Sequence, residues 1–365
     1  MHSHLTHIRL AAVAVLAIPA LAGAASPGSP PAASAGVVTA YVLNGGAVTP
    51  INTVTNQALK QIPTGGGSFF MVITPNGNKV YADGSDSSGE PVVLPIRTAT
   101  NKPGTSILVA RTPSALGVTP DSTTLYVVDQ DSNDAIAVST ATSQIVGTVP
   151  TGEAPVSIAI TPNGTTGYIG VADNTVTPFA VATNAAGPAI KLRYIPWRFA
   201  ITPNSKTAYV DGGSNVVTVI NTATNEIRTR IQVGAGAGDI AITPNGRTAY
   251  VSTSAGVVPV NTATNRPGTL IKIPGGDIAI TPNGTTAYVA AGSGVVTPVN
   301  TATNKPGKPI SVGTSASSIA ITPNGATAYV TSGLGVTPIN IATNKPGKLI
   351  KVPGGAGLIM ITRVA

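Results

Sequence analysis

Residues 240–273 read IAITPNGRTAYVSTSAGVVPVNTATNRPGTLIKI and contain four short segments rich in β-branched residues. The segments are Ile240–Thr243, Thr248–Val251, Val257–Asn261 and Leu270–Ile273, and Gly, Pro, Asn or Ser residues separate them. Short runs of this kind between turn-forming residues are typical of β-strands. The stretch therefore predicts four consecutive strands.

The turn between the first two segments is Thr243–Gly246, with the sequence Thr-Pro-Asn-Gly. Proline presets the φ angle of the second turn position, asparagine tolerates the third, and glycine adopts the left-handed conformation that returns the chain as an antiparallel hairpin. Ser122 and Ser205 replace the glycine in two other copies, where we expect slight strain. The motif recurs almost unchanged at 74–77, 161–164, 281–284 and 322–325.

One tyrosine marks each copy of this unit along the chain. Neighbouring marker tyrosines are 38 to 45 residues apart, and they are Tyr41, Tyr81, Tyr126, Tyr168, Tyr209, Tyr250, Tyr288 and Tyr329. A four-strand antiparallel unit repeated about every 41 residues is the signature of a propeller blade. We therefore predict an all-β protein, a β-propeller of about eight four-stranded antiparallel blades, with seven blades as an alternative count. A β-solenoid is a second alternative, although its coils usually lack a tight hairpin.

The two ends of the repeat region predict how the ring closes. The first unit begins at its second strand, within Val37–Leu43, whereas Gly357–Thr362 at the end of the chain resembles an isolated first strand. We expect the C-terminal strand to complete the N-terminal blade, because closure hides both open sheet edges.

Six of the units carry a proline within their third strand. Proline cannot donate a hydrogen bond to a neighbouring strand. We therefore expect a short fourth strand or a bulge beside Pro50, Pro95, Pro178, Pro259, Pro298 and Pro338.

The N-terminus predicts export. Residues 1–24 combine a polar start, an apolar run from Leu10 to Ala22 and small residues around Gly23, which together are typical of a signal peptide. The apolar run is short for a membrane span, although an uncleaved anchor is the alternative. Residues 25–36 are rich in Pro, Ser and Ala and read as a linker, so 37–365 form the propeller domain. We expect a secreted protein, at the cell surface or free, with no transmembrane segment in the mature chain.

Composition limits the chemistry of the mature chain. There is no cysteine, and all three histidines lie in the predicted signal at positions 2, 4 and 7. Ser-His-Asp triads, thiol nucleophiles, histidine-ligated haem and the usual zinc sites are therefore excluded after cleavage. The formal charge of +8 is mild for 365 residues, and no aromatic platform interleaves the basic residues, so nucleic-acid binding is not expected.

The units resemble the YVTN-type β-propeller repeat proteins, a family of exported and surface-associated bacterial proteins. Its tetrapeptide is matched by Tyr41-Val42-Leu43-Asn44, by 250–253 (YVST) and by 329–332 (YVTS), beside the Thr-Pro-Asn-Gly and Asn-Thr-Ala-Thr-Asn segments. The resemblance covers roughly residues 37–365. It implies a propeller, commonly of seven blades, and it implies no single activity.

Residues that depart from the repeat are the candidates for a site. Residues 129–134 read DQDSND, and Asp129, Asp131, Asn133 and Asp134 present oxygens much as a calcium loop begins. The sixth position is not Gly and the twelfth, Thr140, is not Glu, so a solvated polar loop is the favoured interpretation and calcium the alternative. No other cofactor is indicated.

A second candidate site lies where the innermost strands begin. Arg198, Asp239 and Asp277 occupy equivalent positions in three successive units, and Trp197 is the only tryptophan. We expect these four residues near one mouth of an axial channel, which is a common ligand site in proteins. A charge pair that holds blades together is the favoured alternative.

These observations favour a non-enzymatic, monomeric binding or scaffolding module for an extracellular or cell-wall ligand. The alternative is a lactonase-like propeller hydrolase that uses carboxylates or calcium at the channel mouth. Without histidine, its base would have to be an Asp or Glu with a raised pKa.

Overall fold

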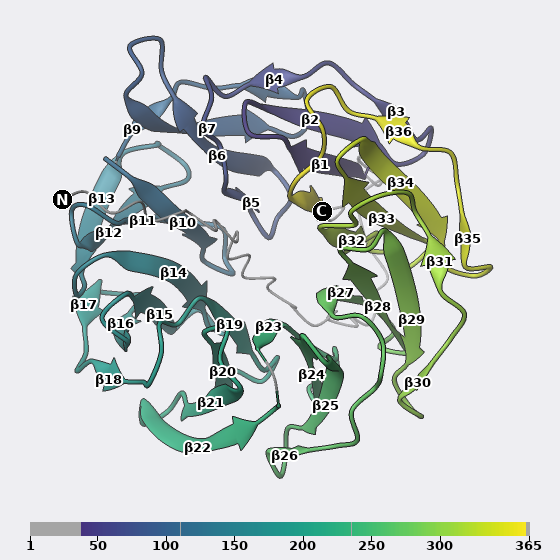
Figure 1. The fold of residues 1–365 in the computed structure, drawn as a ribbon. Helices are drawn as coiled ribbons and strands as arrows, with labels where there is room; N and C mark the ends of the chain where they lie inside the picture. The colour runs from purple at the N-terminus through teal and green to yellow at the C-terminus, as the bar shows by residue number, and fades with distance from the viewer. Residues whose placement is uncertain (1–37, 110, 235, 363–365) are drawn as a thin grey trace, which may run out of the picture.

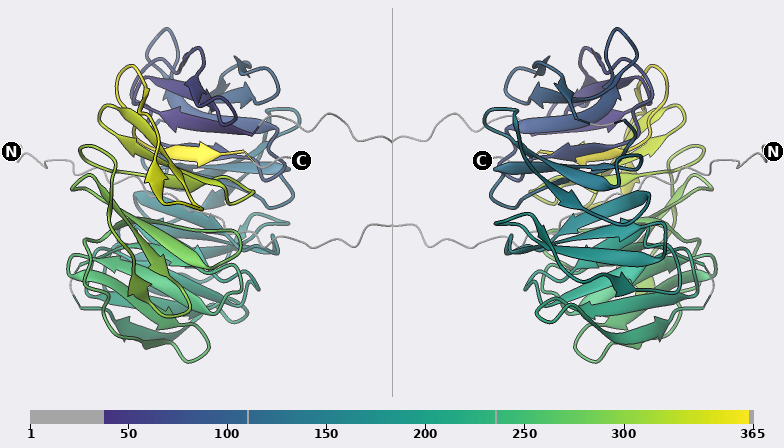
Figure 2. Two further views of the ribbon diagram at one scale, coloured as in Figure 1. Left: turned by 90° about the vertical axis from the view of Figure 1, so that its right-hand side faces the viewer. Right: turned by 90° about the vertical axis from the view of Figure 1, so that its left-hand side faces the viewer.

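The computed structural model describes residues 38–109, 111–234 and 236–362, and these residues form eight separate antiparallel sheets. The sheets stand as blades around a common axis, and the side views show them packed next to one another (Figures 1 and 2). The predicted signal peptide and linker lie outside the described residues. Within the described part of the chain, no helix is long and apolar enough to cross a lipid bilayer.

In the first four blades, the strands follow one another from the ring axis outward. Blade 1 contains β37 (Ile359–Ile361), β1 (Thr39–Leu43), β2 (Ala47–Asn52), β3 (Gln57–Ala58) and β4 (Ile62–Pro63). Blade 2 contains β5 (Met71–Ile73), β6 (Lys79–Ser85), β7 (Pro91–Arg97), β8 (Lys102–Pro103) and β9 (Ile107–Leu108). Blade 3 contains β10 (Pro113–Val118), β11 (Thr124–Asp129), β12 (Asp134–Ser139) and β13 (Ile145–Pro150). Blade 4 contains β14 (Pro155–Ile160), β15 (Thr166–Val171), β16 (Thr175–Ala180), β17 (Ala185–Ala186) and β18 (Ile190–Lys191).

The other four blades have the same order of strands. Blade 5 contains β19 (Arg198–Ile201), β20 (Thr207–Asp211), β21 (Val216–Asn221) and β22 (Glu226–Gln232). Blade 6 contains β23 (Ala237–Ile242), β24 (Thr248–Thr253), β25 (Gly256–Asn261) and β26 (Arg266–Pro267). Blade 7 contains β27 (Gly276–Ile280), β28 (Thr286–Ala291), β29 (Val295–Asn300), β30 (Lys305–Pro306) and β31 (Ile310–Ser311). Blade 8 contains β32 (Ile319–Ile321), β33 (Thr327–Ser332), β34 (Gly335–Asn340), β35 (Lys345–Pro346) and β36 (Ile350–Lys351).

The fold prediction is confirmed, with eight blades rather than the seven that the family resemblance implied. The predicted closure is confirmed as well, because β37 pairs antiparallel with β1 and places Met360 opposite Tyr41. The last strand of the chain therefore becomes the inner strand of the first blade, as the yellow strand beside the purple ones shows (Figure 1). Each inner strand also contacts the inner strands of both neighbouring blades, so the ring is continuous.

The hairpin turns adopt the conformation that their sequence predicts. In the Thr243–Gly246 turn, the amide of Gly246 donates to the carbonyl of Thr243 at 2.7 Å, and Gly246 has a φ of 70°. Ser122 and Ser205 adopt the same left-handed conformation, with φ values of 64° and 60°. Their hydroxyls accept backbone hydrogen bonds from Asn76 and Asn163 of the preceding blade, which offsets part of the strain.

The outer strands confirm the expectation from the third-strand prolines. In the six blades that carry the proline, the fourth strand is interrupted beside it; in blade 1, β3 and β4 pair with β2 on either side of Pro50. Blades 3 and 5 have Ala137 and Val219 instead, and there β13 and β22 are continuous with a local bulge. A residue without an N–H thus decides whether the rim strand is whole or split.

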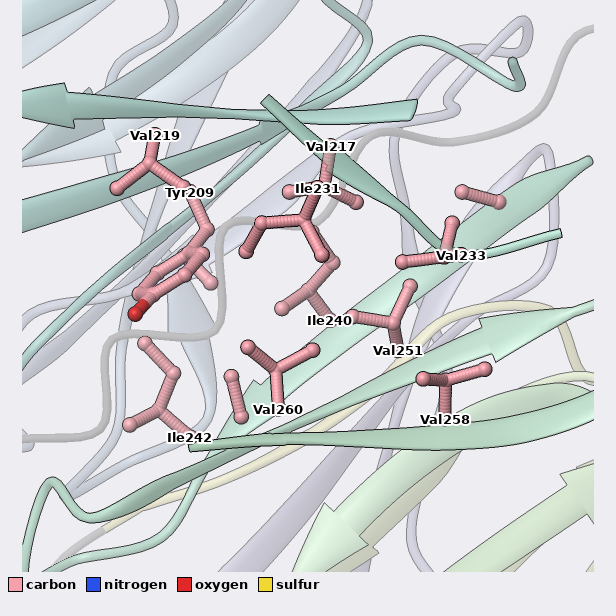
Figure 3. Close-up of a cluster of buried hydrophobic side chains, with 13 residues drawn as sticks. Tyr209, Val217, Val219, Ile231, Val233, Ile240, Ile242, Val251, Val258 and Val260 are labelled. Atoms are coloured by element: carbon pink, nitrogen blue, oxygen red, sulfur yellow. The ribbon is translucent and has the colours of Figure 1, made fainter. Parts of the chain in front are cut away.

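Each blade junction contains one apolar cluster. Figure 3 shows the cluster between blades 5 and 6, in which Val217 and Ile231 of blade 5 face Ile240 and Val251 of blade 6. The other seven junctions have equivalent clusters, including the closing junction, where Ile359 packs with Tyr329. The core of the protein is therefore a ring of eight layers, in which no junction can be lost without exposing two apolar faces.

The marker tyrosines link each blade to the next. Seven of them donate a hydrogen bond of 2.5–2.7 Å from the hydroxyl to the side-chain oxygen of an asparagine in the next blade. The pairs are Tyr41–Asn101, Tyr126–Asn184, Tyr168–Asn225, Tyr209–Asn265, Tyr250–Asn304, Tyr288–Asn344 and Tyr329–Asn56. Each asparagine lies in the turn after the third strand and has a positive φ of 52–58°. Burial raises the pKa of Tyr329 to about 12, so the hydroxyl stays protonated as a donor.

Candidate functional site at the ring axis

Charged residues of blades 5, 6 and 7 gather where the inner strands begin. We call Arg198, Asp211, Asp239 and Asp277 the axial cluster. Arg198 is the first residue of β19, Asp239 lies in β23 and Asp277 in β27, and these three neighbouring inner strands contact one another in turn. Two of the cluster's carboxyl groups, Asp211 and Asp277, have pKa values that respond to Arg198 and Asp239. The structure thus brings together three of the four residues predicted for this site and adds Asp211.

Arg198 connects blade 5 to blade 6. It stands directly opposite Asp211 in the pairing of β19 with β20, so opposite charges face each other across two strands. Its Nη1 atom would lie 3.6 Å from a Cβ atom placed on Gly238, which shows that the guanidinium extends over blade 6.

The two aspartates of blades 6 and 7 each bind a backbone amide of the following blade. The amide of Ile278 donates to Oδ2 of Asp239 at 2.8 Å, and the amide of Ile319 donates to Oδ2 of Asp277 at 2.9 Å. Asp239 lies at an irregularity in the pairing of β23 with β24, between Ala237 and Ile240. Bulges of this kind re-aim side chains and are frequent beside functional sites. The aspartates therefore join blades through main-chain groups, in addition to any role toward a ligand.

Two carboxyl groups of the axial cluster, those of Asp277 and Asp211, hold their protons more tightly than an ordinary aspartate. Burial raises the pKa of Asp277 to about 7, and the negative charge of Asp239 adds to the effect, while the Ile319 amide and Arg198 oppose it. Burial likewise raises the pKa of Asp211 to about 6, opposed by a backbone hydrogen bond from Gly213 and by Arg198. Asp277 and Asp211 therefore keep a proton up to a higher pH than an ordinary aspartate, and a protonated carboxyl group can both donate and accept a hydrogen bond.

Trp197 stands next to the cluster in sequence, and its side chain is 42% exposed. Its backbone amide donates to the carbonyl of Asp211 at 2.9 Å, which continues the pairing of β19 and β20 toward the start of the strand. An exposed indole offers a flat apolar face to a ligand, although Trp197 and Arg198 are successive residues of an extended segment and so point to opposite faces of it.

Asp211, which is 1% exposed and ends β20, was not among the residues that the sequence predicted for this site. Its position two residues after the marker Tyr209 could have indicated it. The strand pairing places Asp211 opposite Arg198.

The oxygens of the acidic loop of blade 3 accept hydrogen bonds from neighbouring protein groups. The buried carboxylate of Asp129 accepts hydrogen bonds from the amides of Arg111, Thr112 and Asp131 at 2.9–3.1 Å. Hydrogen bonding to these amides lowers its pKa against the opposing effect of burial. In blade 2 the buried carboxylate of Asp83 likewise accepts hydrogen bonds from the backbone amides of residues 69 and 70.

The other three residues that were predicted to bind calcium through their oxygens also accept hydrogen bonds from protein groups. Asp131 accepts from the hydroxyl of Thr112 at 2.6 Å, Asn133 accepts from the amide of Ala154 at 2.9 Å, and Asp134 accepts from the hydroxyl of Ser132 at 2.6 Å. Among the residues that the structure describes, no group of three or more acidic, His or Cys side chains is placed to hold a metal ion. Calcium binding by this loop stays a prediction.

No protein-family model matches the chain, and no curated protein matches it in sequence. Many solved structures are similar in fold, and two of them show the range of the likeness. One is described as the hydrazine synthase of Kuenenia stuttgartiensis, at a TM-score of 0.58 and 20% identity over 79% of this chain and 96% of that one. The other is the dihydro-heme d1 dehydrogenase NirN in complex with DHE, at a TM-score of 0.76 and 13% identity over 92% of this chain and 77% of that one. At these identities the likeness shows the propeller fold alone.

Proposed function

We propose that this chain is an exported binding or scaffolding protein that acts outside the cell or at the cell surface. The signal-like segment 1–24 and the resemblance to the YVTN-type repeat proteins support export. The repeated positions are occupied by turns, interblade hydrogen bonds and apolar layers, so recognition falls to residues that depart from the repeat. In the axial cluster, charged residues that differ from the repeat come together from three successive blades. This observation carries the proposal.

The chemistry of the axial cluster suits a polar wall or surface ligand. Three carboxyl groups outnumber the single guanidinium, so the site favours ligands that offer hydrogen-bond donors or positive charge. Trp197, the residue before Arg198, is partly exposed and adds an apolar surface near the start of β19. Hydroxyl- or amine-bearing groups of a cell-wall polymer satisfy both requirements.

A pull-down from cell-wall fractions tests this proposal. The mature chain should retain a wall component, and Arg198→Ala and Asp277→Asn should each weaken retention severalfold. Arg247→Ala is the matched control, because Arg247 is an exposed arginine in the turn before β24. Retention by the two cluster variants equal to that of Arg247→Ala would remove the axial cluster from the proposal. A parallel sample with a calcium chelator reports on the acidic loop of blade 3.

The raised pKa of Asp277 favours one second candidate, a carboxylate-dependent hydrolase. A base with a pKa of about 7 next to a second carboxylate can accept a proton from an attacking water near neutral pH. A screen of lactones and esters tests this candidate. Any turnover found should rise with pH through about 7 and fall in Asp277→Asn, and turnover unaffected by this substitution would rule the candidate out.

A further inference from the structure

A cleft of about 420 Å³ lies between blades 2 and 3, away from the axial cluster. Blade 2 supplies its wall from β6, β7 and the stretch between β8 and β9, and blade 3 supplies the turn before β13; the two blades are neighbours in the ring (Figure 1). Its lining includes Lys79, Arg97, Ile107, Thr142, Ser143 and Gln144.

Two basic residues of blade 2 depart from the repeat at this cleft. Lys79 stands two residues before the marker Tyr81, a position that is Thr in the other seven units. Arg97 ends β7, where five of the other units have Asn. The pairing of β6 with β7 places Lys79 directly opposite Arg97. Like charges opposite each other across two strands destabilise a sheet, so this pair has a cost that an anion between the charges would offset.

The third departure comes from blade 3 and leaves room for a ligand. Ser143 occupies the position of the asparagine that binds the marker tyrosine at the other seven junctions. The hydroxyl of Tyr81 consequently has only a long contact of 3.5 Å, to the carbonyl of Thr140. The ammonium of Lys79 also donates to that carbonyl, which holds the side chain at the junction and leaves further N–H groups for a ligand. The junction that lacks the Tyr–Asn bond is thus the junction that carries the cleft.

The chemistry of the lining selects the ligand class. Two cations and no acidic residue line the cleft, and Thr142, Ser143 and Gln144 add neutral hydrogen-bond donors. Pro95, Ile96 and Ile107 provide an apolar floor. Arg and Lys together with hydroxyls are the usual partners of carboxylate and phosphate groups, and the volume is that of a small-molecule site.

We propose that the cleft between blades 2 and 3 binds a small molecule that carries one carboxylate or phosphate group. The group would lie between Lys79 and Arg97, and the rest of the molecule would pack on the apolar floor. The inference does not rest on the axial cluster, which lies in other blades.

Titration calorimetry with glucose 6-phosphate, glucuronate and glucose tests the proposal on the mature chain. One or both of the anionic sugars should bind at millimolar concentration, more weakly as salt is added, and neutral glucose should not. The two anions distinguish a phosphate site from a carboxylate site. Binding of neither anion, or equal binding of glucose, would overturn the proposal.

The equivalent positions of the other blades show which substitutions to test. Lys79→Thr and Arg97→Asn introduce residues that other blades carry, and each should weaken anion binding about tenfold or more while the melting temperature stays level or rises. Ser143→Asn should restore a hydrogen bond from Tyr81, raise the melting temperature and abolish binding. Lys206→Thr removes an exposed lysine of blade 5 and is the control. Full affinity in Lys79→Thr and Ser143→Asn would contradict the assignment of the cleft.

Discussion

The hydroxyl of Tyr329 donates a 2.6 Å hydrogen bond to Oδ1 of Asn56, which joins the last complete repeat to the first across 273 residues. The same bond links six other pairs of neighbouring blades. The junction that closes the ring is therefore built like the junctions between consecutive units. The tyrosine carries the donor, and the asparagine supplies both the acceptor and the left-handed conformation of the turn.

Loss of one of these hydroxyls should have a small and measurable effect on stability. Tyr329→Phe should lower the free energy of unfolding by about 1 kcal/mol, because the amide oxygen of Asn56 loses its donor in a partly buried place. Chemical denaturation measures the change. Tyr81→Phe is the matched control, since its hydroxyl makes only the 3.5 Å contact, and it should cost clearly less. Equal losses in the two variants would show that the Tyr–Asn bond does not stabilise the ring.

Stability should depend on pH through Asp277 and Asp211. Their pKa values are raised to about 7 and about 6 in the folded chain, from 3.8 for an ordinary aspartate. Between pH 4 and pH 7 the folded state therefore binds more protons than the unfolded state, so the free energy of unfolding falls as the pH rises through this window. With these two values, the expected loss between pH 5 and pH 8 is about 4 kcal/mol at most.

Asp277→Asn should flatten this pH dependence, because asparagine does not ionise and its Oδ1 can still accept from the amide of Ile319. Melting curves at pH 5 and pH 8 make the comparison, and Asp173→Asn, at an exposed turn of blade 4, is the control. A wild-type chain that is more stable at pH 8 than at pH 5 would contradict the assigned pKa shifts. The comparison stays above pH 4, because carboxylates with a lowered pKa, such as Asp129, protonate only below that pH.

Asp129 should stabilise its hairpin without metal. Asp129→Ala leaves the amides of Arg111, Thr112 and Asp131 without their acceptor, so the free energy of unfolding should fall by about 1–3 kcal/mol. The loss should be the same with calcium and with a chelator. Asp134→Ala is the comparison, because Asp134 accepts from the exposed Ser132 and should cost less. A loss confined to the calcium-loaded sample would instead support the calcium interpretation of the loop.

Most of the architecture was predictable because each blade repeats the same local chemistry. The Thr-Pro-Asn-Gly turns set the inner hairpins, the prolines split the outer strands, and the isolated segment 357–362 indicated the closure. The turns and the prolines act within one blade, and the closure could be predicted because one end of the repeat region lacks a first strand while the other end has an extra one. The number of blades also followed, since every blade carries one marker tyrosine.

The partners across blades were not predictable in the same way. Tyr209 and Asn265 lie 56 residues apart, and the sequence around either residue does not indicate that it binds the other. Arg198 and Asp211 became a pair only once the register of β19 and β20 was known. The cleft at Ser143 forms where blade 3 lacks the asparagine of the other junctions and where blade 2 places Lys79 opposite Arg97. The sequence does not show that these two features lie together, because they belong to different blades.

The closed ring on which both sites depend is tested most directly by thermal unfolding of a chain that ends at Ala356. This chain lacks β37, so β1 loses its inner partner and the apolar layers around Leu358 and Ile359 are opened. Removal of one such buried side chain typically costs about 2–5 kcal/mol, so the shortened chain should melt far below the full chain, and a peptide of residues 357–365 added in trans should restore part of the loss. An unchanged melting temperature, with no response to the peptide, would contradict the closed ring.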